Sequence, residues 1–170
     1  MTLEEWLEVL PLQKMSEGVL IASIEDVLEH TGNWNRNYGG HWVKMFSHRY
    51  FNFREHGTAC VRCGAKGLVF VLEKDRKFPE QKGHFNLYGQ RPSGMYVLMT
   101  KDHIVPKSKG GPDRLSNYQT MCAICNVKKG GNFEPGYVPV DQPALPVLDS
   151  FPIFEEGEDY KRKQSRFEEG

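Results

Sequence analysis

Two Cys-x-x-Cys pairs constrain the fold of this chain more than any other feature. One pair stands in "CVRCG" (60–64) and the other in "CAICN" (122–126). Four thiolates form a closed tetrahedral site for structural zinc, with no position left for a substrate. The 58 residues between the pairs exceed the roughly 15–20 of a simple zinc ribbon, so the chain must leave the site and return. The predicted zinc ligands are Cys60, Cys63, Cys122 and Cys125; the alternative is four reduced thiols in a metal-free core.

Charge is distributed unevenly along the chain. The net charge is zero, but residues 1–35 carry −6, residues 36–132 carry +11, and residues 133–170 carry −5. A basic middle between two acidic ends is typical of a protein that binds a polyanion. The alternative is a basic face that contacts only solvent.

The N-terminal section shows helical periodicity. Thr2 and Glu5 form a capping box, which predicts a short helix that ends at Pro11. Apolar residues at helical spacing predict a second helix over 17–30. The segment "HWVKMFSHRYFNFREH" (41–56) interleaves aromatic and basic residues. It is either an amphipathic helix whose aromatic side chains fill the core, or a surface that stacks bases and neutralises phosphates.

Apolar runs in the basic middle section predict strands. They cover 67–74, 84–89 and 95–105, with a loop at "FPEQKG" between the first two. Beyond Gly131 the chain becomes rich in proline and acidic residues. Residues 133–170 are therefore expected to form an irregular arm, with one short terminal helix.

The stretch "KDHIVPKSKGGPDRLSNYQTMCAICNVKKGG" (101–131) carries the chemistry. An Asp-His pair ends the third strand, a Gly-Gly turn reverses the chain, and a short strand, "YQTMC", runs into a helix. This order predicts a β-loop-β-α unit. Because neighbouring residues on a strand face opposite sides, we expect a strand end or a bulge at Asp102 and His103.

The pattern "DHIVP…GG…N…CxxCNxxK" resembles the HNH endonuclease family, also called ββα-metal, over roughly residues 60–131. Within the family it is similar to members with a four-cysteine zinc clamp, including phage junction-resolving endonucleases. The resemblance implies that His103 is the general base that activates water. Asp102 and Asn126 match the ligands of the catalytic cation, Asn117 matches the residue that fixes the loop, and Lys129 matches a phosphate contact.

One departure from the family changes the expected metal. Many relatives carry a histidine at or one turn beyond the position of Asn126, where this chain has Gly130. Asp and Asn offer oxygen ligands, which fit Mg²⁺ or Mn²⁺. An unperturbed imidazole has a pKa of about 6.5, so it is largely neutral at pH 7 and can accept a proton. We therefore expect zinc for folding and magnesium or manganese for chemistry.

The expected reaction is metal-dependent hydrolysis of DNA, duplex or branched, that leaves 5′-phosphate and 3′-hydroxyl ends. RNA is a further candidate substrate. The alternative function is a zinc-stabilised module that binds nucleic acid without cutting it. A dimer is one option for the oligomeric state. Basic residues near the motif are expected to contact phosphates without reading sequence: Arg62, Lys107, Lys109, Lys128 and Lys129.

The expected fold is α+β. A small zinc-stabilised ββα-metal core (57–132) is expected to follow an N-terminal helical segment (1–56) and to precede the irregular arm (133–170). The start "MTLEEWLEVL" lacks the basic region of a signal peptide, and no apolar run has the length of a membrane span. We therefore expect a cytoplasmic protein without membrane contact.

Overall fold

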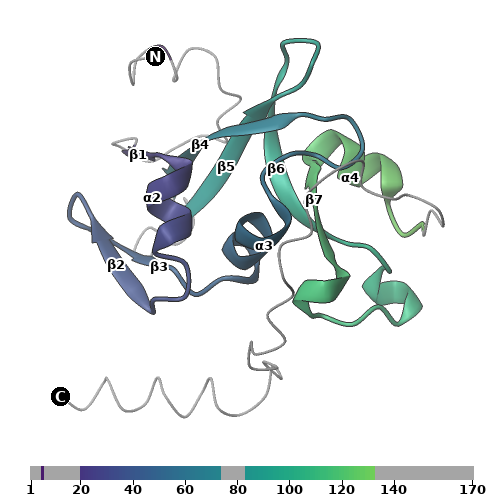
Figure 1. Cartoon of the computed structure of the whole chain (residues 1–170), viewed down its shortest axis with the longest axis horizontal. Helices are drawn as coiled ribbons and strands as arrows, with labels where there is room; N and C mark the ends of the chain where they lie inside the picture. The colour runs from purple at the N-terminus through teal and green to yellow at the C-terminus, as the bar shows by residue number, and fades with distance from the viewer. Residues whose placement is uncertain (1–4, 6–19, 74–82, 133–170) are drawn as a thin grey trace.

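The computed structural model describes residue 5, residues 20–73 and residues 83–132. Figure 1 shows the elements in these ranges. They are β1 (Leu20–Ala22), α2 (Ile24–Glu29), β2 (Asn35–Tyr38), β3 (His41–Lys44), α3 (His48–His56), β4 (Lys66–Glu73), β5 (His84–Gln90), β6 (Tyr96–His103), the 3-10 turns η1 (Lys107–Lys109) and η2 (Leu115–Asn117), β7 (Tyr118–Cys122) and α4 (Ala123–Lys129).

The main sheet is antiparallel with the strand order β1-β4-β5-β6-β7, and β2 and β3 form a separate hairpin. Strand β6 changes its partner along its length. It pairs with β5 from Tyr96 to Leu98, and with β7 from Met99 to His103. Beyond Leu98, no strand among the described residues pairs with the β5 side of β6, so the sheet forks there.

Helices α2 and α3 contribute to the large hydrophobic core on one face of the sheet. Phe70 and Phe85 of the sheet are fully buried there, and Tyr50 of α3 packs edge-on to Phe70. The hydroxyl of Tyr50 accepts the backbone N–H of Phe85 at 2.8 Å, so a buried polar atom is satisfied. Truncating Phe70 to Ala would cost about 3–5 kcal/mol through lost burial and the cavity left behind.

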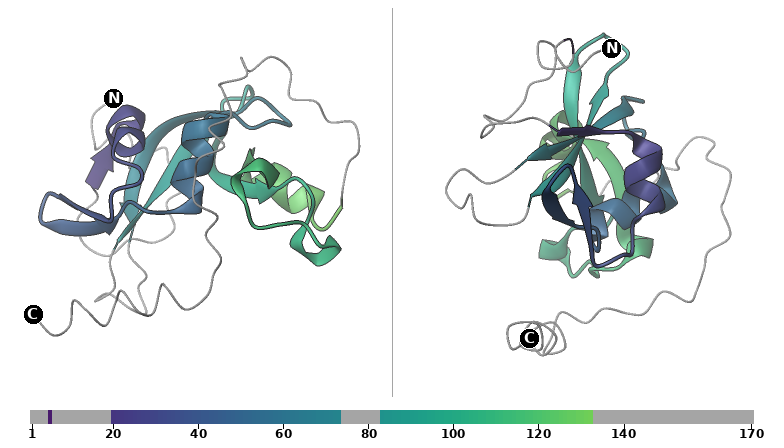
Figure 2. Two further views of the ribbon diagram at one scale, coloured as in Figure 1. Left: turned by 60° about the horizontal axis from the view of Figure 1, so that its bottom comes forward. Right: turned by 90° about the vertical axis from the view of Figure 1, so that its left-hand side faces the viewer.

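Strands β6 and β7 and helix α4 form a ββα unit (Figure 2). Helix α3 is tied to β7 through Asn52, whose Nδ2 donates to Oγ1 of Thr120 at 2.9 Å. The loop after β6 needs glycine at position 111, because a Cβ there would lie 1.8 Å from the carbonyl oxygen of Val105. The sequence Gly-Gly in this turn thus permits a close backbone approach.

The strands expected over 67–74, 84–89 and 95–105 are confirmed as β4, β5 and β6, and "YQTMC" is confirmed as β7. The helix expected over 17–30 is only partly right. Leu20–Ala22 is a strand paired with β4, and the helix begins after Ser23, whose side chain accepts the N–H of Asp26. At Leu20–Ala22, pairing with strand β4 at the edge of the sheet outweighs the helical spacing of apolar residues.

The segment 41–56 also differs from a single helix. Residues His41–Lys44 form β3, and α3 begins after the N-cap Ser47. The described part of residues 1–56 is therefore mixed rather than helical, which corrects the expected helical segment. Tyr50 and Phe53 fill the core, as the amphipathic interpretation requires, whereas Trp42 is 57% exposed. The capping-box helix and the arm at 133–170 lie outside the described residues.

Within the part of the chain that the structure describes, no helix has the length and hydropathy needed to cross a bilayer.

Candidate active site

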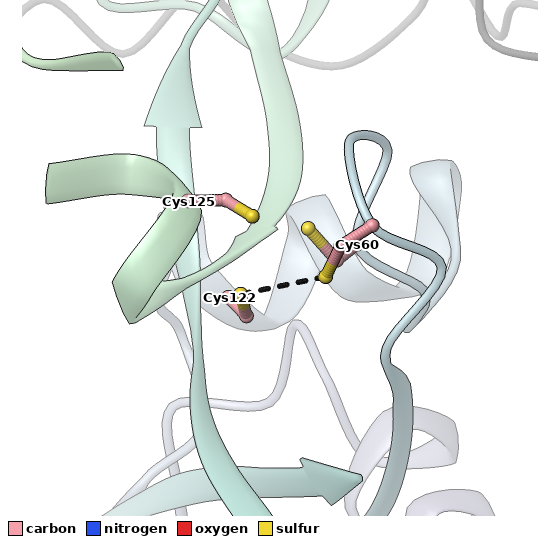
Figure 3. A group of neighbouring side chains, drawn as sticks. Cys60, Cys122 and Cys125 are labelled. Carbon is pink, nitrogen blue, oxygen red and sulfur yellow. Dashed lines mark hydrogen bonds between the residues drawn. The ribbon is translucent and has the colours of Figure 1, made fainter. Parts of the chain in front are cut away.

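The four cysteines meet at the junction of three segments. Cys60 and Cys63 lie in the turn after α3, Cys122 ends β7, and Cys125 lies in the first turn of α4. Figure 3 shows the side chains of Cys60, Cys122 and Cys125 gathered together. All four sulfur atoms lie within 4.8 Å of one another, and the Sγ atoms of Cys63 and Cys122 are 3.7 Å apart. Tetrahedral zinc with bonds of about 2.3 Å places its sulfurs about 3.8 Å apart. The cluster can hold a zinc ion.

Local backbone bonds shape this cluster. The N–H of Cys60 donates to Ala65 O at 2.7 Å, and the N–H of Gly64 donates to Cys60 O at 2.9 Å, with Gly64 at φ 70°. Burial raises the pKa of Cys122 and Cys125. Burial acts on Cys63 in the same direction, but hydrogen bonds, the largest from the Ala65 backbone, lower its pKa to about 7. Buried thiolates need a cation, and the donor set fits zinc.

His103 is the last residue of β6, and its ring packs edge-on to its cross-strand partner Tyr118, with 5.0 Å between centroids. The strand end expected here is confirmed, and β6 pairs with β7 up to this point without a bulge. Nε2 of His103 lies 2.8 Å from Oδ1 of Asp113. An ionised carboxylate only accepts hydrogen bonds, so Nε2 carries the hydrogen and Nδ1 is the nitrogen that can accept a proton.

Asp113 gathers four donors. Oδ1 accepts from His103, from the hydroxyl of Tyr118 and, at 3.5 Å, from Lys101, while Oδ2 accepts from Lys107 at 2.7 Å. Burial acts to raise the pKa of Asp113, but these hydrogen bonds and the nearby positive charge outweigh it. The pKa of this carboxyl is held well below its usual value of 3.8. Asp113 is thus a charged anchor for the His103 imidazole.

Two basic side chains flank Tyr118 beside this anchor. Nζ of Lys101 lies 3.9 Å from the centroid of the Tyr118 ring, and Nδ1 of His48 lies 2.9 Å from its hydroxyl oxygen. Burial lowers the pKa of Lys101, and Asp113 acts in the opposite direction. Alternate residues of a strand share a face, so Lys101 and His103 lie together on the face that α3 covers.

Asp102 lies on the opposite face of β6, toward α4. Oδ2 is 2.9 Å from Nζ of Lys129 and accepts from Gln119 at 2.7 Å. Lys129 also donates to the carbonyl oxygen of His103 at 2.6 Å, and the two charged side chains are only 6% and 8% exposed. The expected phosphate contact through Lys129 does not fit this geometry, because its ammonium group points inward to Asp102.

Asn126 lies at the same interface between β6 and α4. Its Nδ2 donates to Oγ1 of Thr100 at 3.0 Å, and Thr100 shares a face of β6 with Asp102. The structure therefore brings the two expected cation ligands, Asp102 and Asn126, to one interface, and it directs His103 to the other face. Both ligands offer oxygen, the donor type that Mg²⁺ prefers, although Lys129 balances the charge of Asp102 here.

Asn117 is buried beneath the loop that follows His103. Its Oδ1 accepts the N–H of Val105 at 2.9 Å, and its Nδ2 donates to Val105 O at 3.0 Å and to Pro112 O at 2.9 Å. These three bonds join the two ends of the loop. Asn117 thus fixes the backbone between His103 and Asp113.

A pocket of about 450 Å³ opens at the fork of the sheet, between the start of α3, the β6 edge and α4. Among the described residues its lining is polar and basic. The lining residues are Ser47, His48, Arg49, Thr100, Lys101 and Asn126.

The remaining residues expected to contact phosphate are exposed. Lys107 is bound to Asp113, and η1 carries Lys109 beside it. Arg62 and Lys128 are exposed on the Cys60–Cys63 turn and on α4. These side chains do not converge on one group in the described contacts.

Asp113, Tyr118 and His48 were not identified as site residues from the sequence, and Arg49 was considered only as part of the basic and aromatic segment 41–56. Asp113 stands in "GGPD", which we interpreted only as a turn, and Tyr118 stands in "YQTMC", which we interpreted only as a strand. The one signal in the sequence for Tyr118 was its position at the start of the strand, directly after Asn117. His48 and Arg49 lie more than 60 residues earlier in the chain, and their only signal was the alternation of aromatic and basic residues in 41–56.

The family model described as HNH endonuclease matches residues 96–138, which include β6, both 3-10 turns, β7 and α4. The match covers about a quarter of the chain and supports an HNH endonuclease-type domain there, with a nuclease-type function, metal binding and a nucleic-acid substrate. The small α+β architecture with clustered cysteines is compatible with it. No curated protein and no solved structure gives a significant match.

Proposed function

We propose that this protein is a metal-dependent HNH endonuclease that hydrolyses phosphodiester bonds of DNA. The single observation that supports it is the His103–Asp113 pair at the end of β6, on a ββα unit clamped by four cysteines. An imidazole with one nitrogen bound to a charged carboxylate is oriented to accept a proton at the other nitrogen. Nothing in a zinc-binding scaffold alone requires such a pair.

His103 would take a proton from water at Nδ1, and Asp113 would stabilise the imidazolium ion that results. Asp102 and Asn126 would hold Mg²⁺ or Mn²⁺, supported by their common position between β6 and α4. When bound, such a cation neutralises charge on the phosphate and on the departing 3′ oxygen. The products would be 5′-phosphate and 3′-hydroxyl ends.

Zinc at the four cysteines would serve the fold. It links the turn after α3 to the β7–α4 junction, and so fixes the helix that carries Asn126. We propose a cytoplasmic location as well, because four thiols that act as metal ligands persist in a reducing compartment.

A second function has one observation in its favour. The Asp102–Lys129 pair is buried and its charges balance without a further cation, which suits a zinc-stabilised module that binds nucleic acid and does not cut it. The two functions differ in whether His103 is required for a chemical step.

Plasmid nicking separates the two functions. We expect nicking with Mg²⁺ or Mn²⁺, its loss in excess chelator, and its loss in His103→Ala, while His41→Ala on the β2–β3 hairpin nicks like the wild type. If wild type and His103→Ala bind DNA equally and neither cuts, the binding module is the correct function. Linear, nicked, branched and single-stranded DNA, with a matched RNA, compared side by side would identify the substrate.

A further inference from the structure

We propose that the pocket at the fork of the sheet is a subsite for a backbone phosphate of a nucleic acid strand, with Arg49 as its main ligand. This inference rests on the proposed nuclease function and deepens it. It assigns substrate binding to helix α3, which lies outside the residues matched by the family model. The class of substrate it implies is a polynucleotide with a phosphate flanking the bond that is cut.

The pocket is a consequence of the sheet topology. Strand β6 leaves β5 after Leu98, and the N-terminal end of α3 lies beside the strand edge exposed there. Arg49 and His48 project from α3, Lys101 from β6 and Asn126 from α4. The lining therefore combines α3 with β6 and α4, which lie about 50 and about 75 residues later in the sequence.

The chemistry of the lining favours an anion. The described residues around the pocket supply a guanidinium, an ammonium, an imidazole, two hydroxyls and an amide, and no carboxylate is among them. Arginine presents its donors in a rigid fork that fits phosphate oxygens. A diester phosphate carries one negative charge and offers only acceptors. The lining is therefore complementary to a diester phosphate both in charge and in hydrogen-bonding groups.

Arg49 is held in place by a buried chain of hydrogen bonds. Its Nη1 donates to Oδ1 of Asn86, and Nδ2 of Asn86 donates to the carboxylate of Glu73. Glu73 is buried and also accepts the hydroxyl of Tyr88 at 2.6 Å. In the described bonds, one of the five N–H donors of Arg49 binds Asn86. This bond fixes the guanidinium at the pocket wall, and other donors are left for a ligand.

The pocket is next to the expected base. Lys101 lines the pocket and contacts the carboxylate of Asp113, which in turn holds His103. His48, also in the lining, contacts the Tyr118 hydroxyl that donates to the same carboxylate. A phosphate bound by Arg49 would therefore hold a strand whose neighbouring bond lies beside His103.

The test compares Arg49→Gln with Arg36→Gln, which removes an equal charge from the β2–β3 hairpin. Substrates are an oligonucleotide and bis(4-nitrophenyl) phosphate, a diester with no flanking phosphate. For Arg49→Gln we expect the KM for DNA to rise about tenfold more than the KM for the small diester, and the slope of log affinity against log salt to fall by about 1. Arg36→Gln should change neither the ratio of the two KM values nor the slope of log affinity against log salt.

Binding to DNA without added Mg²⁺ or Mn²⁺, measured by fluorescence anisotropy, keeps this inference separate from the proposed function. If the wild type cleaves neither substrate but Arg49→Gln still lowers the salt slope, the nuclease is wrong and the subsite stands. Equal losses on both substrates, or an unchanged slope, overturn the subsite. Zinc content and thermal unfolding check the fold. If Arg49→Gln does not fold, Arg49→Lys replaces it, because lysine keeps the positive charge but lacks the forked guanidinium. Arg49→Lys should weaken DNA binding by several-fold and keep the salt slope. If it does not weaken binding, the subsite is wrong.

Discussion

Nε2 of His103 lies 2.8 Å from Oδ1 of Asp113, ten residues further along the chain. The loop between them is closed by Asn117, and the carboxylate is held by Lys107 and Tyr118. Because the pKa of Asp113 lies well below 3.8, the carboxylate stays charged wherever an imidazole titrates. The pair therefore defines which nitrogen of His103 bears hydrogen.

Asp113→Asn should lower nicking by about tenfold to a hundredfold, because a carboxamide can donate to Nε2 and so favour the wrong tautomer of His103. Asp26→Asn, a carboxyl paired with Arg36 on another part of the fold, is the matched control. Equal nicking rates for Asp113→Asn and wild type would remove Asp113 from the mechanism.

Lowering the pH should reduce the unfolding free energy of the wild type more than that of Asp113→Asn. The pKa of Asp113 is lower in the folded state than its usual 3.8, so its stabilising contribution is full above about pH 4 and is lost as the pH falls. Urea unfolding at about pH 6 and about pH 3 measures this difference. A variant that loses as much unfolding free energy as the wild type over this interval would contradict the hydrogen bonds assigned to Asp113.

Removal of zinc should abolish cooperative unfolding. The cluster joins three segments through four sulfurs within 4.8 Å, and structural zinc contributes about 10 kcal/mol or more, as much as the whole stability of many domains. Elemental analysis should find one zinc per chain, and Cys125→Ser should lose it. Zn²⁺ but not Mg²⁺ should restore the transition after chelation. A chelated protein that keeps its unfolding transition would refute a structural role.

Lys129→Met should cost about 3–5 kcal/mol of unfolding free energy, because it leaves the buried carboxylate of Asp102 without its cation. The neighbouring Lys128→Met, at an exposed position of α4, should change stability by less than about 0.5 kcal/mol. If Asp102 and Asn126 hold a divalent cation, Mg²⁺ or Mn²⁺ should recover part of the loss in Lys129→Met. No recovery at saturating metal would count against the cation ligands.

Asn117→Ala should cost about 2–3 kcal/mol, since three backbone groups of Val105 and Pro112 lose their hydrogen bonds to this buried side chain at once. Nicking should fall further than stability alone explains, because the loop no longer aligns Asp113 with His103. Asn37→Ala, which removes a single exposed bond to Gly40, is the control. Urea unfolding and nicking of the same preparations compare the two effects, and a variant with full activity would exclude loop alignment by Asn117.

Much of the central architecture could be predicted from local sequence. Strand runs identified β4, β5, β6 and β7, because side-chain alternation and β-branched or aromatic content act over a few residues. The Cys-x-x-Cys spacing predicted a four-sulfur cluster, since each knuckle is a local turn that presents two sulfurs. Helix periodicity failed at Leu20–Ala22, where pairing with a distant strand competes with a short helix.

The sequence by itself determined which residues were candidates for the site: four thiols, an Asp-His pair and two asparagines in a recognisable order. Only the tertiary structure decided their partners. It paired Asp102 with Lys129, His103 with Asp113, and Arg49 with Asn86. Periodicity reports which face a side chain occupies, but a hydrogen-bond partner depends on how a helix crosses a sheet. That crossing is set by core packing between segments far apart in the chain.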